Sequence, residues 1–344
     1  MNLLDNFQRY IRRNELAAPE DFILLTVSGG VDSMVMLSLF VRSGYRVGVA
    51  HCNFQLRGVE SEEDEELVRR EAEKYGVPWY NKRFDTKGEM ERTGESMEMA
   101  ARRLRYAWFD ELSREHGYTV VAIAHHIDDS IETFFINLLR GTGLRGLTGI
   151  TTHAGKLIRP LMFASRKDIL EYAVANRIPF REDSSNRSTK YLRNKIRLGL
   201  VPRIREINPK FTDLMRRNID RLSDAQRFID ALQRAGCTLC LDDFGTGFAS
   251  FAYLKHLQAR VLKIDGLFVR NLPREHDNQV FVRSIIEVAH GMGKLAVAEF
   301  VEDEQTLQLL QGMGVDMVQG YHLDKPRADH PGLHGDGRAG IAPA

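Results

Sequence analysis

The chain has 344 residues, more than one average domain holds, so we expect two domains. Its 48 basic and 47 acidic residues nearly balance, which excludes a strong overall positive field for nucleic acid. Apolar runs fall short of the roughly 20 residues that span a bilayer, Met1–Asp5 does not begin a signal peptide, and three cysteines make no disulfide framework. We therefore expect a cytoplasmic protein without a membrane segment.

Strands and helices alternate along roughly the first 200 residues, which predicts an α/β fold with a doubly wound parallel sheet. The expected strands are Phe22–Val27, Arg46–His51, Trp79–Phe84 and Thr119–Ala124. Helices are predicted over Met34–Phe40, over Ser61–Tyr75 with Ser61 and Asp64 as a capping box, and over Met97–His116. Gly76 and Gly117 then end the second and third of these helices.

A glycine turn with the residues Ser28, Gly29, Gly30, Val31, Asp32 and Ser33 follows the first predicted strand. Two glycines allow a tight turn and close approach to a ligand, and the helix start behind them suits phosphate. The lysine of G-x-x-x-x-G-K-[ST] is absent, which excludes the loop of kinases and GTPases. The turn resembles the PP-loop of ATP pyrophosphatases, and this resemblance implies that it binds the pyrophosphate end of ATP.

Further motifs accompany the glycine turn in order along the chain: His51–Gly58, Ala101–Tyr106, His125–Thr133, Leu139–Gly141, Arg159–Leu161, Asp183–Asn186 and Tyr191–Arg197. Together they resemble tRNA(Ile)-lysidine synthetase over about residues 1–225. The resemblance implies an ATP-dependent ligase whose partners are free lysine and tRNA(Ile) with a CAU anticodon. In that family ATP adenylates the C2 oxygen of the wobble cytidine, and the lysine amine then displaces AMP.

The resemblance also implies roles for individual residues. Ser28–Ser33 with Mg²⁺ would hold the ATP phosphates, with Asp32 as a metal ligand. Asp129 and Glu132, three residues apart at a helix start, would receive the lysine ammonium. The other implied residues are His125 and Arg197 in catalysis and His51, Asn53 and Arg102 in nucleotide binding. Arg102, Arg105 and Arg197 are natural partners for phosphate or for the substrate carboxylate. For any single motif the alternative stays open: a strand-end histidine pair and an ordinary charge cluster at a helix start.

A basic region after the nucleotide-binding part is the expected contact for tRNA: Arg166, Lys167, Arg187, Lys190, Arg193, Lys195, Arg197, Arg203, Arg205 and Lys210. For any single residue of this set, a solvated basic surface is the simpler interpretation. The additional C-terminal domains with which the family usually grips tRNA are not expected here.

A second βα series begins near residue 236, with expected strands Thr238–Asp242, Val261–Ile264, Leu295–Glu299 and Met317–Tyr321. Its motifs, Leu241–Gly247, Leu262–Asp265, Ala298–Glu302 and Gln319–Tyr321, resemble the second half of an EAL domain, a barrel that hydrolyses cyclic di-GMP with two metal ions. The resemblance implies Asp242 and Asp243 as metal ligands, Glu299 as a metal ligand or base, and Lys263 as the residue that orients water. Four βα units cannot close a barrel, so we expect a half-barrel with a vestigial, metal-free site and no phosphodiesterase activity.

The expected organisation is an ATP-binding domain over residues 1–215, a helical junction over 216–230, the half-barrel over 231–326 and a disordered tail over 327–344. One helix is predicted to run through the junction, as in a chimera of two α/β fragments. Cys237 and Cys240 are expected as packed thiols in a buried strand. The alternatives to lysidine synthesis are an inactive chimera and a module that binds cyclic di-GMP without cutting it, with self-association through the open half-barrel edges.

Overall fold

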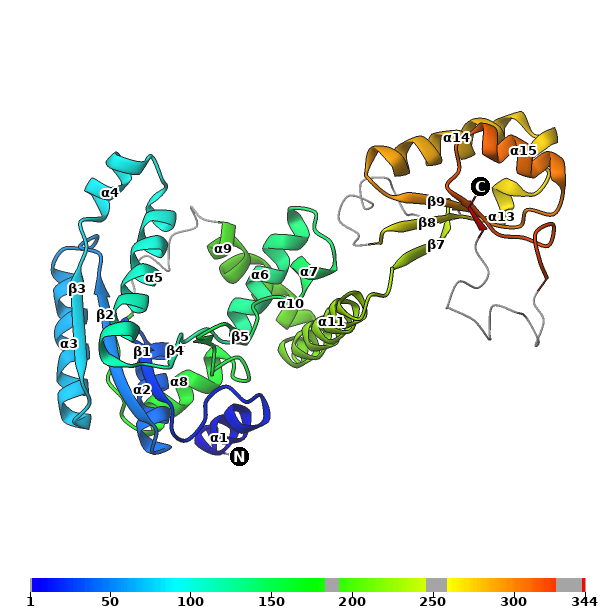
Figure 1. Cartoon of the computed structure of the whole chain (residues 1–344). Coiled ribbons are helices and arrows are strands. Elements are labelled where there is room, and N and C mark those ends of the chain that lie inside the picture. Colours follow the sequence, from blue (N-terminus) through cyan, green and yellow to red (C-terminus); the bar gives the residue numbers. More distant parts are fainter. Residues whose placement is uncertain (1, 183–191, 246–258, 326–341, 344) are drawn as a thin grey trace. The chain divides into compact units, whose positions relative to one another are not determined.

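The computed structural model describes residues 2–182, 192–245, 259–325 and 342–343 (Figure 1). It divides into two compact units, one with residues 1–141 and 146–221 and one with residues 142–145 and 222–344. The predicted motif Asp183–Asn186 and the residues Arg187, Lys190 and Thr246–Gly247 lie outside the described residues. Within the described ranges, no helix combines the length and the apolar character that a bilayer crossing needs.

The first unit is built on a six-stranded sheet of order β3-β2-β1-β4-β6-β5, in which only β5 is antiparallel to its neighbour. Its strands are β1 (Phe22–Thr26), β2 (Arg46–Asn53), β3 (Trp79–Arg83), β4 (Val120–Ala122), β5 (His153–Ala154) and β6 (Leu157–Ile158). The chain moves outward from β1 to β2 and β3, and then returns to place β4 on the other side of β1. This confirms the predicted doubly wound sheet and puts its topological switch point between β1 and β4, where such sheets bind ligands.

Helices cover both faces of this sheet because the central strand β1 is apolar and buried on both sides. One core contains apolar side chains from α1 (Leu3–Arg13), α2 (Val31–Arg42), α3 (Val59–Tyr75) and α8 (Arg166–Ala175). The opposite core is filled by Trp108, Phe109 and Leu112 of α5 (Met97–His116), which follows α4 (Thr86–Thr93). The predicted bounds of α5 are confirmed, and Gly117 ends it in the left-handed conformation at φ +75°.

The start of α3 differs from the prediction. Its N-cap is Gly58, with Ser61 already in the first turn, so the predicted capping box of Ser61 and Asp64 is wrong. Ser61 Oγ instead accepts a hydrogen bond from the backbone N–H of Arg57 at 3.3 Å. Asp64 binds Arg57 and Arg181 and is nearly buried, so a long-range ion pair replaces the local cap.

A smaller helical cluster stands beside the sheet within the first unit. It combines α6 (Ile127–Leu139), α9 (Leu192–Lys195), a π-helix, η2 (Ile196–Leu200), α10 (Val201–Ile207) and the first half of α11 (Phe211–Arg234) around one apolar core. The short α7 (Leu144–Leu147) follows α6. The continuous α11 confirms the prediction that one helix runs through residues 216–230.

The second unit contains a sheet of order β11-β10-β9-β8-β7, parallel except for β11. The strands are β7 (Cys240–Phe244), β8 (Val261–Ile264), β9 (Leu295–Ala298), β10 (Met317–Val318) and β11 (Ala342–Pro343), so two residues of the expected tail pair with β10. Its helices are α13 (Gly266–Val269), η3 (Leu272–Arg274), α14 (His276–Gly291) and α15 (Glu304–Gly312). In the described residues the sheet has two ends, as expected for four βα units.

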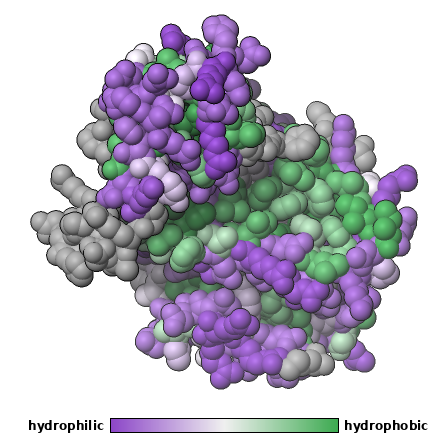
Figure 2. All heavy atoms as spheres, turned by 90° about the vertical axis from the view of Figure 1, so that its right-hand side faces the viewer, coloured by the Kyte–Doolittle hydropathy of each residue, from purple (hydrophilic) through white to green (hydrophobic). Residues whose placement is uncertain are grey.

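Apolar side chains remain exposed on this second unit. Phe228, Leu267, Phe300 and Tyr321 expose 64%, 66%, 44% and 60% of their surface. Figure 2 shows hydrophobic side chains gathered in patches that are bordered by hydrophilic side chains. β7 is the edge strand of its sheet, and both Cys237 and Cys240 are exposed, so the prediction of two packed thiols in a buried strand is wrong.

Gly48 in β2 provides a test of how tightly the first sheet is packed. A Cβ added there would lie 1.8 Å from the hydroxyl oxygen of Tyr118, which is buried. We expect Gly48→Ala to lower the free energy of unfolding of the first unit by about 1–3 kcal/mol, the usual range for overpacking. Both tryptophans, Trp79 and Trp108, belong to this unit, so urea unfolding followed by tryptophan fluorescence reports on it.

The matched control is Gly199→Ala in η2, where an added Cβ meets no atom within 4 Å. This variant is expected to be as stable as the parent chain or slightly more stable, because alanine favours helix. An unchanged midpoint for Gly48→Ala would contradict the packing of Tyr118 against β2.

Candidate active site at the carboxyl edge of the first sheet

The glycine turn lies at the end of β1 and is held by its own serines. Ser33 Oγ accepts a hydrogen bond from the Ser28 backbone N–H at 3.1 Å and donates to the Gly30 carbonyl at 2.9 Å. Gly29 has φ +90°, a value that favours glycine, and Gly30 is the N-cap of α2 without a side-chain cap. The first turn of α2 therefore directs its N–H groups toward the carboxyl edge of the sheet, as an anion site requires.

A cavity of about 280 Å³ opens directly beside this turn. Its polar wall comes from the turn, with Ser28, Gly30, Asp32 and Ser33, together with His125. Its opposite wall is mainly apolar, and the Arg105 guanidinium lies 5.3 Å from the centre of the Phe54 ring. The remaining lining residues are Thr26, Val27, Ala50, Cys52, Phe54, Arg105, Phe109, Ile123 and Ala124. A polar end and an apolar end suit a ligand that carries both charge and a flat ring.

Asp32 carries an incompletely bonded carboxylate at this wall. Its Oδ2 pairs with Arg166 Nη1 at 3.1 Å, while its Oδ1 is buried without a hydrogen-bond partner among the described residues. His126 Nε2 lies 3.6 Å from that Oδ1. Burial raises the pKa of Asp32 although His126 and Arg166 oppose the shift. A cation placed at Oδ1 would compensate both the missing bond and the buried charge.

A second carboxylate pair lies on the first turns of α6. Arg197 binds Glu132 through two contacts, Nε to Oε1 at 2.6 Å and Nη2 to Oε2 at 3.0 Å. The same guanidinium reaches Asp129 Oδ1 at 3.3 Å. The structure thus brings Asp129 and Glu132 together, as their spacing on one helix face suggested, and adds Arg197 from η2.

The two carboxylates of this pair titrate differently. Burial opposes ionisation of Asp129, but His126, His125 and Arg197 outweigh it and hold its pKa below the ordinary value. Burial raises the pKa of Glu132 against the opposing effect of Arg197. Of the two carboxylates, Asp129 therefore stays ionised to lower pH than Glu132 does.

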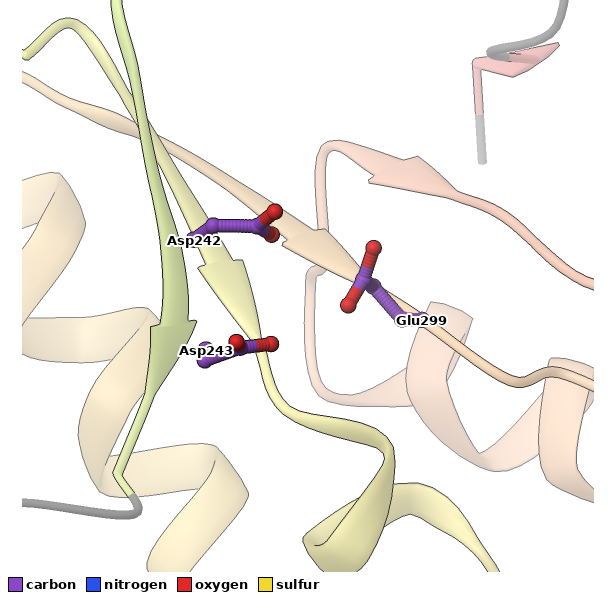
Figure 3. A group of neighbouring side chains, drawn as sticks. All are labelled: Asp242, Asp243 and Glu299. Carbon is purple, nitrogen blue, oxygen red and sulfur yellow. The ribbon is translucent and has the colours of Figure 1, made fainter.

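The second unit holds the other group of acidic residues (Figure 3). Asp242 and Asp243 on β7 and Glu299 after β9 place one carboxylate oxygen each within 4.8 Å of one another. Lys263 on β8 pairs with Asp242 at 2.7 Å and also with Glu299. Partial burial opposes the charge, but these two carboxylates raise the pKa of Lys263 above its ordinary value. One internal ammonium already pairs with two of the three carboxylates, so a metal ion at this group would have to compete with Lys263.

Comparison with known proteins identifies the first unit. The family model described as PP-loop domain matches residues 3–204, more than half of the chain. The chain belongs to the PP-loop domain family. A second model, described as EAL domain, matches residues 206–326, so the predicted chimeric organisation is confirmed.

Curated relatives cover mainly the PP-loop unit. The chain is 43% identical over 216 residues to tRNA(Ile)-lysidine synthase of Bacteroides thetaiotaomicron, a match that spans 63% of this chain and 51% of the relative. It is 40% identical over 232 residues to the protein of the same name from Chlorobaculum tepidum, spanning 65% and 69%. The chain spans about half the length of the first of these relatives.

Among solved structures, the U34-tRNA thiolase NcsA from Methanococcus maripaludis with its [4Fe-4S] cluster has a similar fold. Its TM-score is 0.53 at 19% identity, and the match covers 64% of this chain and 78% of that one. At this identity the likeness concerns the fold alone, and it agrees with the parallel sheet of the PP-loop unit.

Three residues expected at the nucleotide do not line the cavity. His51 is buried with its Nδ1 2.9 Å from the Val27 carbonyl, and the Asn53 amide donates to Glu65 at 2.7 Å. Both side chains therefore fix the strand ends around the turn. Arg102 is exposed, with its guanidinium 5.4 Å from the centre of the Tyr106 ring. Arg105, one helical turn further along α5, takes the place that was expected for Arg102.

The expected basic surface also divides in two. Arg166, Arg197 and Arg205 form ion pairs with Asp32, Glu132 and Asp128, so their charges are largely used inside the PP-loop unit. Lys167, Lys195, Arg203 and Lys210 are exposed. The prediction missed Asp128, which accepts the Arg166 backbone N–H at 2.7 Å and pairs with Arg205. Its position next to Asp129 in the sequence could have indicated that Asp128 lies at the site.

Lys263 gives a direct test of the acidic group in the second unit. We expect only weak Mn²⁺ binding to this group in the parent chain by calorimetry, because the metal has to displace the ammonium. Lys263→Met should strengthen Mn²⁺ binding about tenfold or more, equivalent to about 1.4 kcal/mol. Adding Asp242→Asn to that variant should abolish the gain, and tight binding by the parent chain would contradict the internal ion pair.

Proposed function

We propose that the PP-loop unit uses ATP to join free lysine to the wobble cytidine of tRNA(Ile). The observation that supports this most is the arrangement of two anionic groups at one sheet edge. The incompletely bonded Asp32 lies beside the glycine turn, and the Asp129–Glu132 pair lies on the adjacent α6, with His126 3.6 Å from both aspartates. One group suits a metal-bound phosphate and the other a substrate ammonium.

ATP would bind with its phosphates at the glycine turn and its base toward the apolar wall. The first-turn amides of α2 and the hydroxyl of Ser28 are donors for phosphate oxygens, while the Ser33 hydroxyl donates to the Gly30 carbonyl and holds the turn. Asp32 would hold Mg²⁺ through Oδ1, the oxygen that has no partner in the described residues. When bound, ATP would supply an activated phosphorus, with pyrophosphate as the leaving group of adenylation and AMP as the leaving group when the lysine amine attacks. The protein's contribution is to hold the phosphates still and to exclude water.

Free lysine would bind with its ammonium at Asp129. The contact of Arg197 with Asp129 at 3.3 Å is longer than its contact with Glu132 at 2.6 Å, so Asp129 keeps more capacity for a new donor. Glu132 would hold Arg197 in place and keep it from closing on Asp129. This assignment places the amine at the carboxyl edge of the sheet, on the side of α6 that meets His126 and Asp32.

The tRNA would contact the exposed basic residues that follow the nucleotide-binding part. Four exposed side chains can contact phosphates: Lys167, Lys195, Arg203 and Lys210. By contrast, Arg166, Arg197 and Arg205 are held in ion pairs within the PP-loop unit. Four such contacts imply strong salt dependence of tRNA binding.

The test is release of AMP from ATP by the full chain, with lysine, tRNA or Mg²⁺ omitted in turn. We expect AMP release above background only when lysine and a tRNA(Ile) transcript that carries CAU are both present, because the lysine amine displaces AMP. A transcript with UAU is the matched control, because uridine offers a different C4 edge at the same position. AMP release that ignores the anticodon, or none with all components, would refute the proposal.

A further inference from the structure

Arg159 is a buried arginine that the proposed chemistry has not used. It follows β6 with only 8% of its surface exposed, and no carboxylate among the described residues lies within ion-pair distance of it. Its Nη1 donates to the Thr151 carbonyl at 2.6 Å, and its Nε donates to His125 Nδ1 at 3.2 Å. A buried cation is ordinarily paired with a carboxylate, whereas this one donates a hydrogen bond to a histidine ring.

The direction of that hydrogen bond fixes the state of His125. A guanidinium has only donors, so the ring nitrogen that receives its N–H must be unprotonated. The proton of the neutral ring is then on Nε2. The charged groups that act on this ring are Asp129 and His126 on α6, Arg159, and Arg193 on α9. Burial, with the help of the nearby cations, lowers the pKa of His125 to about 4, so the ring is neutral at physiological pH.

We propose that Arg159 is a positioning residue that holds His125 as the Nε2–H tautomer, so that His125 offers a hydrogen-bond donor to the cavity and no base. His125 lines the cavity beside Ser28 and Asp32, where the proposed function places the ATP phosphates, and this role rests on that function. A neutral donor can bind an anionic phosphate oxygen throughout the neutral pH range. It cannot take a proton from the lysine amine through Nε2.

His51 supplies an internal reference with the opposite tautomer. Its Nδ1 lies 2.9 Å from the Val27 carbonyl, which can only accept, so the proton of that ring is on Nδ1. Burial lowers the pKa of His51 as well, so both rings are neutral together. The two histidines should therefore give opposite signatures in a single spectrum.

The first experiment is a long-range ¹⁵N–¹H correlation spectrum of the full chain with labelled histidine at neutral pH. Signals are assigned by comparison with His125→Gln and His51→Gln. We expect the proton on Nε2 in His125 and on Nδ1 in His51. A proton on Nδ1 of His125 would overturn the proposal. This test needs no assay of activity, so its outcome does not depend on whether the chain makes lysidine.

The second experiment compares Arg159→Met with Arg159→Lys. The methionine variant loses both the donor and the charge, so His125 should become a mixture of tautomers with a raised pKa, and kcat for AMP release should fall about tenfold. The lysine variant keeps one donor and the charge, and it should restore the tautomer and most of kcat. An unchanged His125 tautomer in Arg159→Met would overturn the proposal. If that variant fails to fold, the parent spectrum and Arg159→Lys decide.

Discussion

Asp32→Asn is expected to lower the rate of AMP release at least a hundredfold, while the PP-loop unit becomes no less stable. The loss follows because the amide removes the charge that would hold Mg²⁺ at Oδ1, and one preorganised electrostatic contact at a reacting phosphate is worth about 10²–10³ in rate. Asparagine has nearly the same shape, so the packing of α2 against the glycine turn is kept.

The stability part of this prediction follows from the direction of the pKa shift. Burial raises the pKa of Asp32, so the folded state binds its proton more tightly than the unfolded state does. Stability contributed by this group is therefore greatest at low pH and is lost as the pH rises past the folded pKa. At neutral pH the ionised Asp32 lowers stability, and a neutral asparagine relieves that cost. Arg166, which loses its partner, is 44% exposed and can return to water.

The matched control for this variant is Asp110→Asn, an exposed aspartate on α5 that does not line the cavity. It should leave both AMP release and the unfolding midpoint unchanged. Full activity in Asp32→Asn would remove Asp32 from the site, and a large loss of stability would mean that the carboxylate has a structural role instead.

Arg197→Met is expected to lower the free energy of unfolding of the PP-loop unit by about 3 kcal/mol, because it leaves the buried Glu132 carboxylate with only its longer contact to Arg193 at 4.0 Å. Glu132 exposes 3% of its surface and receives two hydrogen bonds from Arg197. The double variant Arg197→Met with Glu132→Gln removes both charges, so it should recover much of the loss. Urea unfolding followed by tryptophan fluorescence gives the free energy of unfolding of the parent chain, the single variant and the double variant, since Trp79 and Trp108 lie in this unit.

The pH dependence of this effect has a definite sign. Burial raises the pKa of Glu132, and removal of the Arg197 cation raises it further. A protonated Glu132 is neutral and needs no counter-ion, so the deficit of Arg197→Met should be smaller at pH 5 than at pH 8. The control is Arg92→Met on α4, which loses a solvent-exposed ion pair with Glu89 and should show a much smaller deficit. Equal deficits for both arginines would contradict a buried pair.

Sequence patterns predicted those elements of the first unit whose ends are set by neighbouring residues, such as helix caps. The helix Met97–His116 begins after Ser96 and ends at Gly117, and both caps are readable from the sequence. The predicted start of α3 was wrong because Asp64 forms ion pairs with Arg57 and Arg181 and does not cap the helix. Arg181 is far from Asp64 along the chain. A local cap cannot be distinguished in sequence from a distant ion pair.

The candidate site was predictable in kind and less so in detail. The glycine turn and the Asp129–Glu132 spacing follow from short motifs, and the structure brings Arg197 to them across 65 residues. The choice between Arg102 and Arg105 depends on which face of α5 packs on the sheet, and the buried Trp108, Phe109 and Leu112 could have indicated it. The pairing of Arg166 with Asp32 joins residues 134 apart, and only the fold reveals it.

Transfer of radiolabelled lysine to a tRNA(Ile) transcript tests the central proposal most directly. The full chain should place label in the CAU transcript in the presence of ATP and Mg²⁺, and the UAU transcript and the Asp32→Asn variant should receive almost none. Label in neither transcript, from a chain whose tryptophan signal shows a folded PP-loop unit, would contradict lysidine synthesis.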